Sequence, residues 1–460
     1  MDTHVVILAA GKGTRMRSAR PKILHRLGGH PLIEHVLRAA EALAPHSIIL
    51  VVGHGADEVR RALAGRPGLQ YAVQEPQLGT AHALLQAEPL LAGATGTLVL
   101  LSGDVPRLTP RTLTRLIAHH DDTRAAATVL TAVVDDPHGY GRIVRHDGQL
   151  ARIVEERDAS PAERAIREIN GGVYAFSLAS VFDAIRSIDA GNAQGEYYLP
   201  DIVTVLRRRG LRVETVTVAD AGEIRGINSR SELAEVGRLV TLKKNDALMA
   251  AGVTIDDPAT AYIDEDVAVG ADTVIHPCVM LEGRTRIGAR CEIHAGSRIV
   301  NSTIADDVTI NNHCVIIDAT VAAGAVIGPF AHLRADAAVG EQARVGNFVE
   351  LKKTTLGAGS KAMHHAYLGD AVIGERVNVG AGTITCNYDG VRKHRTVIED
   401  EAFIGSDSQL VAPVTIGKGA YVGSGATVRE NVPPGALAVS AGRQRNIEDW
   451  VKKRKKAPRE

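Results

Sequence analysis

Large aliphatic side chains recur every six residues through the second half of this chain, and this period constrains the fold more than any other feature. The first run is Val269, Ile275, Leu281, Ile287, Ile293 and Ile299. After slips of one residue the pattern continues through Ile304, Ile310, Ile316, then Val321, Ile327, Leu333, Val339, Val345, Leu351, then Leu356, Leu368, Ile373, Val379, and returns at Ile398, Ile404, Leu410, Ile416, Val422 and Val428. No α-helix has a period of six. Hexapeptide repeats instead form a parallel β-helix, with one short strand and one turn per repeat.

The repeat is interrupted between Val379 and Ile398, at "TCNYDGVRKHRT". We therefore expect a loop, from about Thr385 to Val397, to be extruded from the coil. Loops on rigid scaffolds often carry function, so this interruption is a candidate functional segment.

The first half of the chain has a different rhythm, in which short β-rich runs alternate with amphipathic segments. This alternation predicts an α/β domain with a largely parallel sheet. The expected strands are Val5–Ala9, Ser47–Val52, Thr97–Leu101, Ala126–Val133 and Gly172–Phe176, and the expected helices are Pro31–Leu43, Ala56–Ala64 and Thr80–Ala87. Ligands of such sheets bind beyond the carboxyl ends of the strands, where Gly11 and the segment Ser102–Asp104 are expected.

A single helix is expected to link the two halves. Ser229 followed by Glu232 is a capping box, apolar residues recur at helical spacing up to Val240, and Gly252 can end the helix. We divide the chain into residues 1–227 (α/β domain), 228–251 (helical linker), 252–435 (β-helix) and 436–460 (C-terminal tail).

Composition excludes several classes of protein. The 460 residues include 53 basic and 53 acidic side chains, so no general electrostatic attraction to nucleic acid is expected. No apolar run approaches the roughly 20 residues of a membrane span, and the N-terminus lacks the basic region of a signal peptide. The four cysteines show no C-x-x-C spacing, which indicates reduced, mostly buried thiols of a cytoplasmic protein. The basic tail "VKKRKKAPRE" is expected to be solvated and disordered, with contact to an anionic ligand or RNA as the alternative.

The N-terminal stretch "VVILAAGKGTRM" joins a strand to a glycine-rich turn. It lacks the third glycine of the dinucleotide fingerprint, and Gly13 stands where a Walker loop needs Ser or Thr. What remains is a flexible loop whose backbone N–H groups can approach phosphate oxygens, with Lys12, Arg15 and Lys22 adding positive charge. An ordinary tight turn between strand and helix is the alternative explanation.

The spacing L-x-x-G-x-G-T-x-M-x-x-x-x-P-K, intact here from Leu8 to Lys22, is the nucleotidyltransferase signature of sugar-1-phosphate pyrophosphorylases. Joined to a long hexapeptide domain, it resembles the bacterial family of bifunctional N-acetylglucosamine-1-phosphate uridylyltransferases and glucosamine-1-phosphate acetyltransferases. Further matching motifs are "EPQLGTAHA", "SGDVP", "GYGRIV", "IVEERD", "EINGGVY", "NAQGEYYLPD", "GPFAHLR", "VGNFVELKK", "KAMHHAYLGD" and "NVGAGTITCNYDG". The resemblance covers nearly the whole chain. It implies a doubly wound α/β domain, a helical arm and a left-handed parallel β-helix that assembles as a homotrimer.

The implied function has two steps. The C-terminal domain acetylates glucosamine 1-phosphate with acetyl-CoA, and the N-terminal domain transfers UMP from UTP to the product. This gives UDP-N-acetylglucosamine, a precursor of bacterial peptidoglycan and lipopolysaccharide, and pyrophosphate. One alternative is a single-activity sugar-1-phosphate nucleotidyltransferase with a regulatory β-helix. A non-enzymatic regulatory or scaffolding subunit is another, but intact Lys22, Asp104 and His364 argue against it.

For the uridylyl site, the resemblance implies binding of phosphates by Arg15 and Lys22, close backbone approach at Gly11 and Gly13, and Mg²⁺ held by Asp104 and Asn228. Uracil contacts are implied for Gln74, Gly79 and Thr80, and sugar contacts for Gly141, Glu155 and Asn170, with Leu8 also at the site. Local explanations remain open. Asp104 could begin a turn before Pro106, Asn228 could cap a helix, and Glu155 could pair with Arg157. Ser102 departs from the family, which often has Tyr at this position.

For the acetyl site, the chemistry needs a base to remove a proton from the attacking amine, and histidine is suited to this at neutral pH. The resemblance selects His364, although the sequence alone does not separate it from His365. Sugar-phosphate binding is implied for Arg334, Lys352, Tyr367, Asn378 and Lys393, and acetyl-CoA binding for Ala381, Asn387, Tyr388, Ser406 and Ser424. Two positions depart: Ser424 replaces a familiar Ala, and Ala441 stands where an Arg is expected, for which Arg443 or Arg445 could substitute. We expect the loop from Thr385 to Val397 to complete the acetyl site of a neighbouring chain.

A metal site in the repeat domain is an alternative role for its histidines, because some hexapeptide proteins are zinc carbonic anhydrases. His276 and His294 lie one residue after a core aliphatic, His313 three after, and His332 one before. Since side chains at different phases point in different directions, we expect no ladder of metal ligands and mostly surface or edge histidines.

Overall fold

The computed structural model of this chain describes residues 2–440, 442 and 444–455 and contains two compact units, Met1–Gly237 and Arg238–Glu460. The boundary between them falls within the long helix α8 (Arg230–Ala250). Within the described part of the chain, no helix combines the length and the apolar character needed to cross a bilayer.

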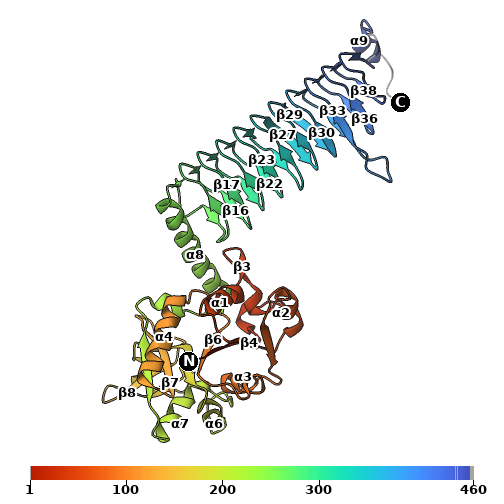
Figure 1. The fold of residues 1–460 in the computed structure, drawn as a ribbon. Coiled ribbons are helices and arrows are strands. Elements are labelled where there is room, and N and C mark those ends of the chain that lie inside the picture. Colours follow the sequence, from red (N-terminus) through yellow and green to blue (C-terminus); the bar gives the residue numbers. More distant parts are fainter. Residues whose placement is uncertain (1, 441, 443, 456–460) are drawn as a thin grey trace. The chain divides into compact units, whose positions relative to one another are not determined.

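The first unit is built on a nine-stranded sheet with the central order β11-β7-β10-β6-β1-β4-β5 (Figure 1). Its strands are β1 (Thr3–Ala9), β4 (Ser47–Val52), β5 (Leu69–Val73), β6 (Thr97–Ser102), β7 (Ala127–Val133), β8 (Arg142–His146), β9 (Gln149–Val154), β10 (Glu168–Ser177) and β11 (Val213–Thr217). Strands β6, β1, β4 and β5 are parallel to their neighbours in this series, so their carboxyl ends share one edge of the sheet.

Helices cover both faces of this sheet. Alternate side chains of each strand point to opposite faces, so Val6 and Leu100 belong to one core while Val5 and Leu101 belong to the other. The first core includes residues of α3, α6 and α7, and the second includes residues of α1, α2 and α4. This is the expected doubly wound arrangement.

The remaining elements of the first unit are short or peripheral. The helices are α1 (Leu32–Glu41), α2 (Ala56–Ala62), α3 (Thr80–Leu85), α4 (Pro110–Thr123), α5 (Pro161–Arg164), α6 (Val181–Ile185) and α7 (Ile202–Arg208), the 3₁₀ turns are η1 (Thr14–Met16), η2 (Lys22–Leu24), η3 (Glu88–Leu91), η4 (Leu199–Asp201) and η5 (Ala221–Ile224), and β2 (Arg26–Leu27) pairs with β3 (His30–Pro31).

The expectation of a largely parallel sheet is only partly right. Strand β10 runs antiparallel to both β6 and β7, and the hairpin β8–β9 adds further antiparallel pairs. Apolar alternation marks a strand but carries no information about its direction, which explains the error. The expected strands and helices are otherwise present, with ends shifted by a few residues.

The second unit is a parallel β-helix whose coils each contribute three short strands (Figure 1). Ile275 pairs with Ile293, Ile293 with Ile310 and Ile310 with Ile327, so one coil contains about 18 residues, or three repeats. These aliphatic residues are buried in one continuous core along the coil axis. The hexapeptide period is thereby confirmed as the period of a β-helix.

The strands of the β-helix fall on three faces. The first face contains β12 (Thr254–Ile255), β15 (Val274–Ile275), β18 (Glu292–Ile293), β21 (Thr309–Ile310), β24 (Val326–Ile327), β31 (Asn378–Val379), β34 (Phe403–Ile404), β37 (Tyr421–Val422) and β39 (Leu437–Ala438). The second contains β13 (Tyr262–Ile263), β16 (Met280–Glu282), β19 (Arg298–Val300), β22 (Val315–Ile317), β25 (His332–Leu333), β32 (Ile384–Cys386), β35 (Gln409–Val411) and β38 (Thr427–Val428). The third contains β14 (Ala268–Val269), β17 (Arg286–Ile287), β20 (Thr303–Ile304), β23 (Thr320–Val321), β26 (Ala338–Val339), β28 (Thr355–Leu356), β30 (Ala371–Ile373), β33 (Thr396–Ile398) and β36 (Val414–Ile416).

Two longer strands, β27 (Arg344–Lys352) and β29 (Lys361–Gly369), run across the corner between the first and second faces. Their first residues pair with strands of the first face, and their last residues pair with strands of the second. Two of the matched motifs, "VGNFVELKK" and "KAMHHAYLGD", lie on these strands except for the last residue of each.

The expected loop leaves the coil between β32 and β33 and projects from the β-helix (Figure 1). Val379 pairs with Ile404, so this coil is about seven residues longer than the others. The ladder of paired strands continues on both sides of the loop, which therefore is an insertion and not the end of the fold.

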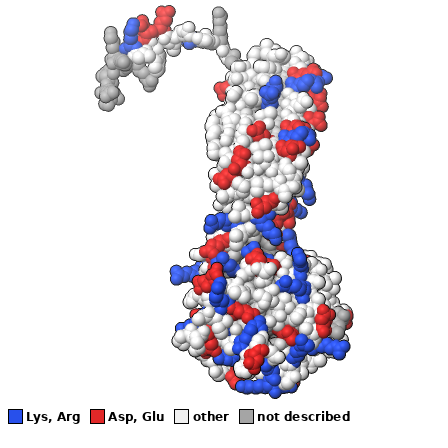
Figure 2. Space-filling view, turned by 90° about the vertical axis from the view of Figure 1, so that its left-hand side faces the viewer, with Lys and Arg blue, Asp and Glu red and all other residues white. Residues whose placement is uncertain are grey.

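Three further expectations concern charge, cysteines and the tail. On the face shown in Figure 2, basic and acidic residues are interspersed over both units, in agreement with the balanced composition. Cys291 and Cys314 are buried, Cys386 is half-buried, and Cys278 is exposed. The tail was expected to be disordered, but its first part forms helix α9 (Trp450–Lys455).

The packing of β30 predicts a large difference between two adjacent aliphatic residues. Ile373 is 1% exposed in the core, whereas Val372 beside it is 41% exposed. Ile373→Ala should lower the free energy of unfolding of the β-helix by about 2–5 kcal/mol, because it removes buried methyl groups and leaves a cavity. The matched variant Val372→Ala should cost less than about 1 kcal/mol. Denaturant unfolding followed by circular dichroism measures both, and equal losses would contradict the assigned register.

Candidate functional site

The loop after β1 is shaped by Gly13, which adopts the left-handed conformation at φ 58° before η1. A Cβ at this position would lie 2.8 Å from Cβ of Lys22. Glycine is therefore needed both for the backbone conformation and for the close packing of Lys22 on the loop.

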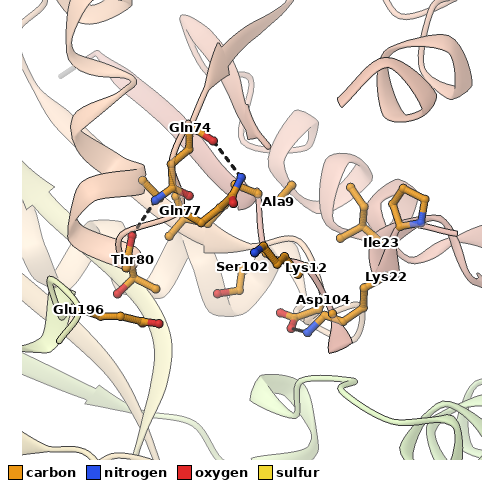
Figure 3. A pocket seen from close by; sticks show the side chains of 17 residues that line it. Ala9, Lys12, Lys22, Ile23, Gln74, Gln77, Thr80, Ser102, Asp104 and Glu196 are labelled. Atoms are coloured by element: carbon orange, nitrogen blue, oxygen red, sulfur yellow. Dashed lines mark hydrogen bonds and ion pairs between the residues drawn. The ribbon is translucent and has the colours of Figure 1, made fainter. Parts of the chain in front are cut away.

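This loop forms one wall of a cavity of about 450 Å³ at the carboxyl edge of the parallel strands (Figure 3). The lining residues come from the ends of β1, β5 and β6 and from the segments that follow them, except Glu196, which lies just before η4. They include Leu8, Gly11, Lys12, Gly13, Lys22, Gln74, Gln77, Gly79, Thr80, Ser102, Asp104 and Glu196. Most residues predicted for the phosphate and uracil contacts thus meet in one cavity. Arg15 is exposed on η1 and is not among the lining residues.

Lys22 connects the two predicted metal ligands. Its ammonium forms an ion pair with Asp104 and donates a hydrogen bond of 2.8 Å to Oδ1 of Asn228. The carboxylate and the amide oxygen therefore converge on one cation, although the two residues are far apart in sequence. Hard oxygen donors arranged in this way also suit a divalent cation.

The suggested role as a helix cap does not account for the side chain of Asn228. The helix cap is supplied by Ser229, whose Oγ accepts from Glu232 N at 3.2 Å, while Glu232 accepts from Ser229 N at 2.9 Å. Asn228 uses only its backbone N–H toward Glu232, which leaves its side-chain oxygen for Lys22. The expected capping box is confirmed, and Asn228 is not the cap.

The predicted uracil contacts are held together by hydrogen bonds at one side of the cavity. Buried Gln74 donates from Nε2 to the carbonyl oxygen of Gly79 at 2.9 Å (Figure 3). Gly79 has φ 111°, and a Cβ there would lie 2.6 Å from the carbonyl oxygen of Tyr197. Thr80 begins α3 and its Oγ1 accepts from Leu199 N at 3.1 Å. The backbone at Gly79 therefore packs too tightly for any larger residue.

The predicted sugar contacts form a second cluster, outside the set of residues that line the cavity. A Cβ on Gly141 would lie 3.2 Å from Glu155 and 3.4 Å from Asn170, and Asn170 N donates to Gly141 O at 2.8 Å. Asn170 lies at a register shift in β10, and its side chain is held by the Tyr174 hydroxyl. Burial raises the pKa of Glu155, and nearby Asp201 adds to the effect. Arg157 donates to Gln194, so the suggested pair with Glu155 is not observed.

In the β-helix, five residues occupy the same position of the six-residue repeat, which we call a phase. Each lies two residues after a buried core residue. These are Asn347, His364, Ala381, Ser406 and Ser424, which follow the successively paired residues Val345, Ala362, Val379, Ile404 and Val422. We call this series the histidine ladder. It contains the predicted base and three of the predicted acetyl-CoA contacts.

His364 is oriented by its neighbour in the ladder. Its Nδ1 lies 2.7 Å from Oδ1 of Asn347, an atom that can only accept, so Nδ1 carries the proton. The lone pair of Nε2 is then available to accept a proton from a substrate. Among the described contacts this orientation distinguishes His364 from His365, which lies in the left-handed region at φ 43°.

A second group lies near the end of β29 and at the extruded loop, and we call it the lysine cluster. Lys352 and Asp370 are joined at 3.1 Å, Asn387 donates to the same carboxylate oxygen, and Arg334 donates to Glu350 at 2.7 Å. The ammonium of Lys352 lowers the pKa of nearby Lys393. The hydroxyl of Tyr367 packs over Gly369, close to the Asn387 amide. Cations suited to a sugar phosphate are therefore gathered here.

Most of the predicted acetyl-site residues thus belong to one of these two groups. Arg334, Lys352, Tyr367, Lys393 and Asn387 belong to the lysine cluster. Asn378 does not belong to the lysine cluster, because it pairs with Lys361 at the opposite end of β29. It directly precedes Val379, the core residue two positions before Ala381.

The extruded loop is a small hairpin organised by Asp389. This carboxylate accepts from the backbone N–H of Val391 at 2.8 Å and Arg392 at 2.6 Å, and from His394 Nε2 at 2.7 Å. These hydrogen bonds lower the pKa of Asp389 to about 2. Tyr388 at the start of the hairpin is 59% exposed.

Two of the repeat-domain histidines lie side by side, although no ladder of metal ligands was expected. His276 and His294 stack with ring centroids 4.6 Å apart and planes 8° apart. Both follow a core isoleucine, and the two isoleucines are paired in consecutive coils. His313 stacks on Phe330 and not on the other histidines, as its different phase predicts.

Sequence reasoning assigned no role to Asp370, Glu350 and Asn347. The missed residues lie in the motifs "KAMHHAYLGD" and "VGNFVELKK", so the motifs contained the signal but no role was assigned. Ala441 and Arg443 lie outside the described residues, whereas Arg445 is described and exposed.

Comparison with known proteins gives family matches in both halves of the chain. The MobA-like NTP transferase domain matches residues 5–189, the GMPPB C-terminal domain residues 258–342, and the bacterial transferase hexapeptide (six repeats) residues 395–430. Three relatives are each called bifunctional protein GlmU. That of Exiguobacterium sp. is 47% identical over 98% of this chain and 100% of its own length. Those of Geobacter metallireducens and Syntrophotalea carbinolica are 48% and 49% identical, over 99% and 98% of this chain and 99% and 97% of their own lengths.

The lysine cluster predicts a role for Asp370, the carboxylate that holds both Lys352 and Asn387. Asp370→Ala should lower acetyl transfer on the order of 10²-fold, because both side chains lose the contact that positions them. Nucleotidyl transfer should be unchanged. The exposed acidic residue Glu341 in the same unit supplies the matched control, Glu341→Ala, which should affect neither reaction. Steady-state assays of both reactions measure these effects, and an unchanged acetyl rate in Asp370→Ala would contradict the positioning role.

Proposed function

Because this chain belongs to the family of the bifunctional GlmU proteins, we propose that it has two catalytic sites, one at the Lys22 cavity and one in the β-helix. The enzyme acetylates glucosamine 1-phosphate with acetyl-CoA. It then transfers UMP from UTP to N-acetylglucosamine 1-phosphate, giving UDP-N-acetylglucosamine, a precursor of bacterial peptidoglycan and lipopolysaccharide, and pyrophosphate. The observation that carries the site assignment is the convergence of Lys22, Asp104 and Asn228 at the edge of the parallel strands.

A coupled assay tests the overall function. Glucosamine 1-phosphate, acetyl-CoA and UTP supplied together should give UDP-N-acetylglucosamine. UDP-sugar formation only from supplied N-acetylglucosamine 1-phosphate would instead indicate the single-activity alternative, with a regulatory β-helix.

In uridylyl transfer, a phosphate oxygen of the sugar attacks the α-phosphorus of UTP and pyrophosphate leaves. Catalysis here depends on positioning and charge neutralisation. The backbone at Gly11 and Gly13 approaches the phosphates, and Lys12, Lys22 and Arg15 supply positive charge. Gln74, Gly79 and Thr80 bind uracil, and Gly141, Glu155 and Asn170 bind the sugar.

The family implies a divalent cation, and we propose that it is Mg²⁺ held by Asp104 and Asn228. The convergence of these two oxygen donors on the Lys22 ammonium supports their ability to bind a cation. Mg²⁺ would neutralise charge on the reacting phosphates.

In acetyl transfer, the sugar amine attacks the thioester carbonyl of acetyl-CoA, and the C–S bond breaks to release coenzyme A. His364 accepts the amine proton at Nε2, and Asn347 orients the ring. Arg334, Lys352, Tyr367, Asn378 and Lys393 bind the sugar phosphate. Ala381, Asn387, Tyr388, Ser406 and Ser424 bind acetyl-CoA.

We further propose that the enzyme is a cytoplasmic homotrimer and that each acetyl site lies between two chains. The division into a histidine ladder and a lysine cluster supports this arrangement, since the two groups can meet across an interface. The ladder is flanked by a stack of Phe330 and Phe348, with centroids 5.4 Å apart and exposures of 48% and 58%. Exposed aromatic side chains of this kind suit a contact between copies. UTP and acetyl-CoA are cytoplasmic metabolites, which supports the location.

The metal assignment predicts the effect of Asp104→Ala. Uridylyl transfer should fall by at least about 10³-fold, because the phosphates lose several kcal/mol of charge stabilisation. Acetyl transfer should survive, since it takes place in the other unit. Separate assays of the two reactions measure this, and equal loss of both would indicate misfolding and not loss of the cation.

The base assignment predicts the mirror result for His364→Ala. Acetyl transfer should fall on the order of 10²–10⁴-fold, the usual contribution of a positioned general base. Uridylyl transfer from supplied N-acetylglucosamine 1-phosphate should be unchanged. The matched variant is His365→Asn, which suits the positive φ of that position. If it were the damaging change and His364→Ala were silent, the assignment would be wrong by one residue.

The shared acetyl site predicts complementation between two inactive variants. His364→Ala changes the histidine ladder and Asn387→Ala changes the lysine cluster. When the two are co-expressed, some interfaces of mixed trimers combine an intact ladder with an intact cluster, so acetyl transfer should partly return. Mixed trimers isolated with two different affinity tags provide the measurement. Mixed trimers without activity would show that each chain builds its own site.

A further inference from the structure

The stacked pair of His276 and His294 forms a group with Glu292 that neither transferase site uses. The three residues lie on β15 and β18 or directly after them, in the early coils of the β-helix. The ring separation of 4.6 Å is close to the spacing between neighbouring strands. The coil geometry therefore sets the separation of the two rings.

Two of the three separations between the ligand atoms of this group are already close to those of a metal site. Nε2 of His276 lies 3.3 Å from Oε1 of Glu292, and Nε2 of His294 lies 3.5 Å from the same oxygen. All three ligand atoms lie within 4.8 Å of one another. Tetrahedral zinc, with bonds of about 2.0–2.2 Å, needs ligand atoms roughly 3.4 Å apart. To bind one ion, the two nitrogens would have to come closer, and the nearly parallel rings would have to tilt until both lone pairs point at it.

Asp256 fixes the orientation of His276 from the other side. Its Oδ2 lies 2.7 Å from Nδ1 of His276. Asp256 follows Ile255, which pairs with Ile275, so it occupies the same phase one coil earlier. A carboxylate at Nδ1 keeps the proton there and directs the Nε2 lone pair toward Glu292, which is the usual outer-shell arrangement of a metal-binding histidine.

The series of ligands ends at His294. At the same phase of the next coil, Asn311 donates its side-chain amide to the carbonyl oxygen of Gly328 at 3.3 Å, and so turns toward the following coil. Three protein ligands therefore face the site, and a fourth position is open to water. Both histidines are about one-quarter exposed, so an ion can enter from solvent.

We propose that His276, Glu292 and His294 bind a divalent transition metal of the zinc type, with Asp256 as the outer carboxylate. Two imidazoles and one carboxylate are a ligand set typical of this class of ion. The ion joins two successive coils and stabilises the first part of the β-helix, because its ligands come from both. This proposal does not depend on the assignments of the two transferase sites.

The test uses the full chain carrying Asp104→Ala, which removes the cation site of the other unit. The metal-free protein is titrated with Zn²⁺ against a chromophoric chelator, and with Co²⁺, whose visible absorption reports four-coordination. We expect one tight site per chain. His276→Ala combined with His294→Ala should weaken Zn²⁺ binding at least about 10²-fold, and Asp256→Asn about 10–100-fold, the usual effect of an outer-shell change.

The control is His313→Asn, which removes another histidine of the same domain but keeps a residue suited to its φ of 58°. It should leave Zn²⁺ affinity unchanged. With Asp104 intact, the histidine double variant should retain both transferase activities, which shows that it folds. Zn²⁺ should raise the thermal midpoint of the parent but not of the double variant. If the double variant is poorly folded, Glu292→Gln replaces it, with the same expected loss of Zn²⁺ affinity. Equal Zn²⁺ affinity in parent and variants, or an equal loss in His313→Asn, would overturn the proposal.

Discussion

The pairing of each coil with the next is the interaction on which the C-terminal half of this protein depends. Parallel hydrogen bonding places every residue above its counterpart one coil earlier, and the buried aliphatic residues fix the phase. Side chains at the same phase then stand at the strand spacing, whatever their chemistry. The histidine ladder, the Phe330–Phe348 stack and the His276–His294 pair all arise in this way. Where the six-residue sequence repeat slips by one residue, the core residues of successive coils still pair. These series of side chains therefore continue through the slip.

The N-terminal unit uses a different constraint, the shared carboxyl edge of its parallel strands. That edge brings together the residues that follow β1, β5 and β6, which explains why Gly11, Gln74 and Asp104 line one cavity. Asn228 reaches the site by another route, since it directly precedes the cap of α8. The Ser229 cap therefore orders the backbone next to Asn228, whose side chain must reach Lys22 from a distant part of the sequence.

Periodicity predicted most of the fold, because it reports which side chains are buried. It could not predict the direction of β10, since an antiparallel strand alternates in the same way as a parallel one. The stacked histidines were missed for a related reason. The period of six gave the phase of each histidine, but only the three-repeat coil shows that His276 and His294 are neighbours. For the proposed sites, the motifs named Lys22, Asp104 and His364, whereas the roles of Asp370 and Asn347 depend on contacts between coils. Contacts of this kind cannot be inferred until the register between successive coils is known.

One corner of the β-helix shows how the same backbone supports different chemistry along its length. The phase directly after the core position is occupied by His276 and His294 in early coils, and by Gly346, Met363, Gly380 and Gly405 in later ones. At Gly380 and Gly405 an added Cβ would lie 2.6 and 2.5 Å from the backbone nitrogen of Ser406 and Ser424, respectively. Glycine is needed there because the backbone of the next coil approaches closely, and the residue that follows each of these glycines belongs to the histidine ladder. Close packing at these glycines thus brings the ladder residues near the next coil, while the coils of His276 and His294 have room for large side chains at the same phase. A ligand-binding group can therefore occupy the early coils without disturbing the proposed acetyl site.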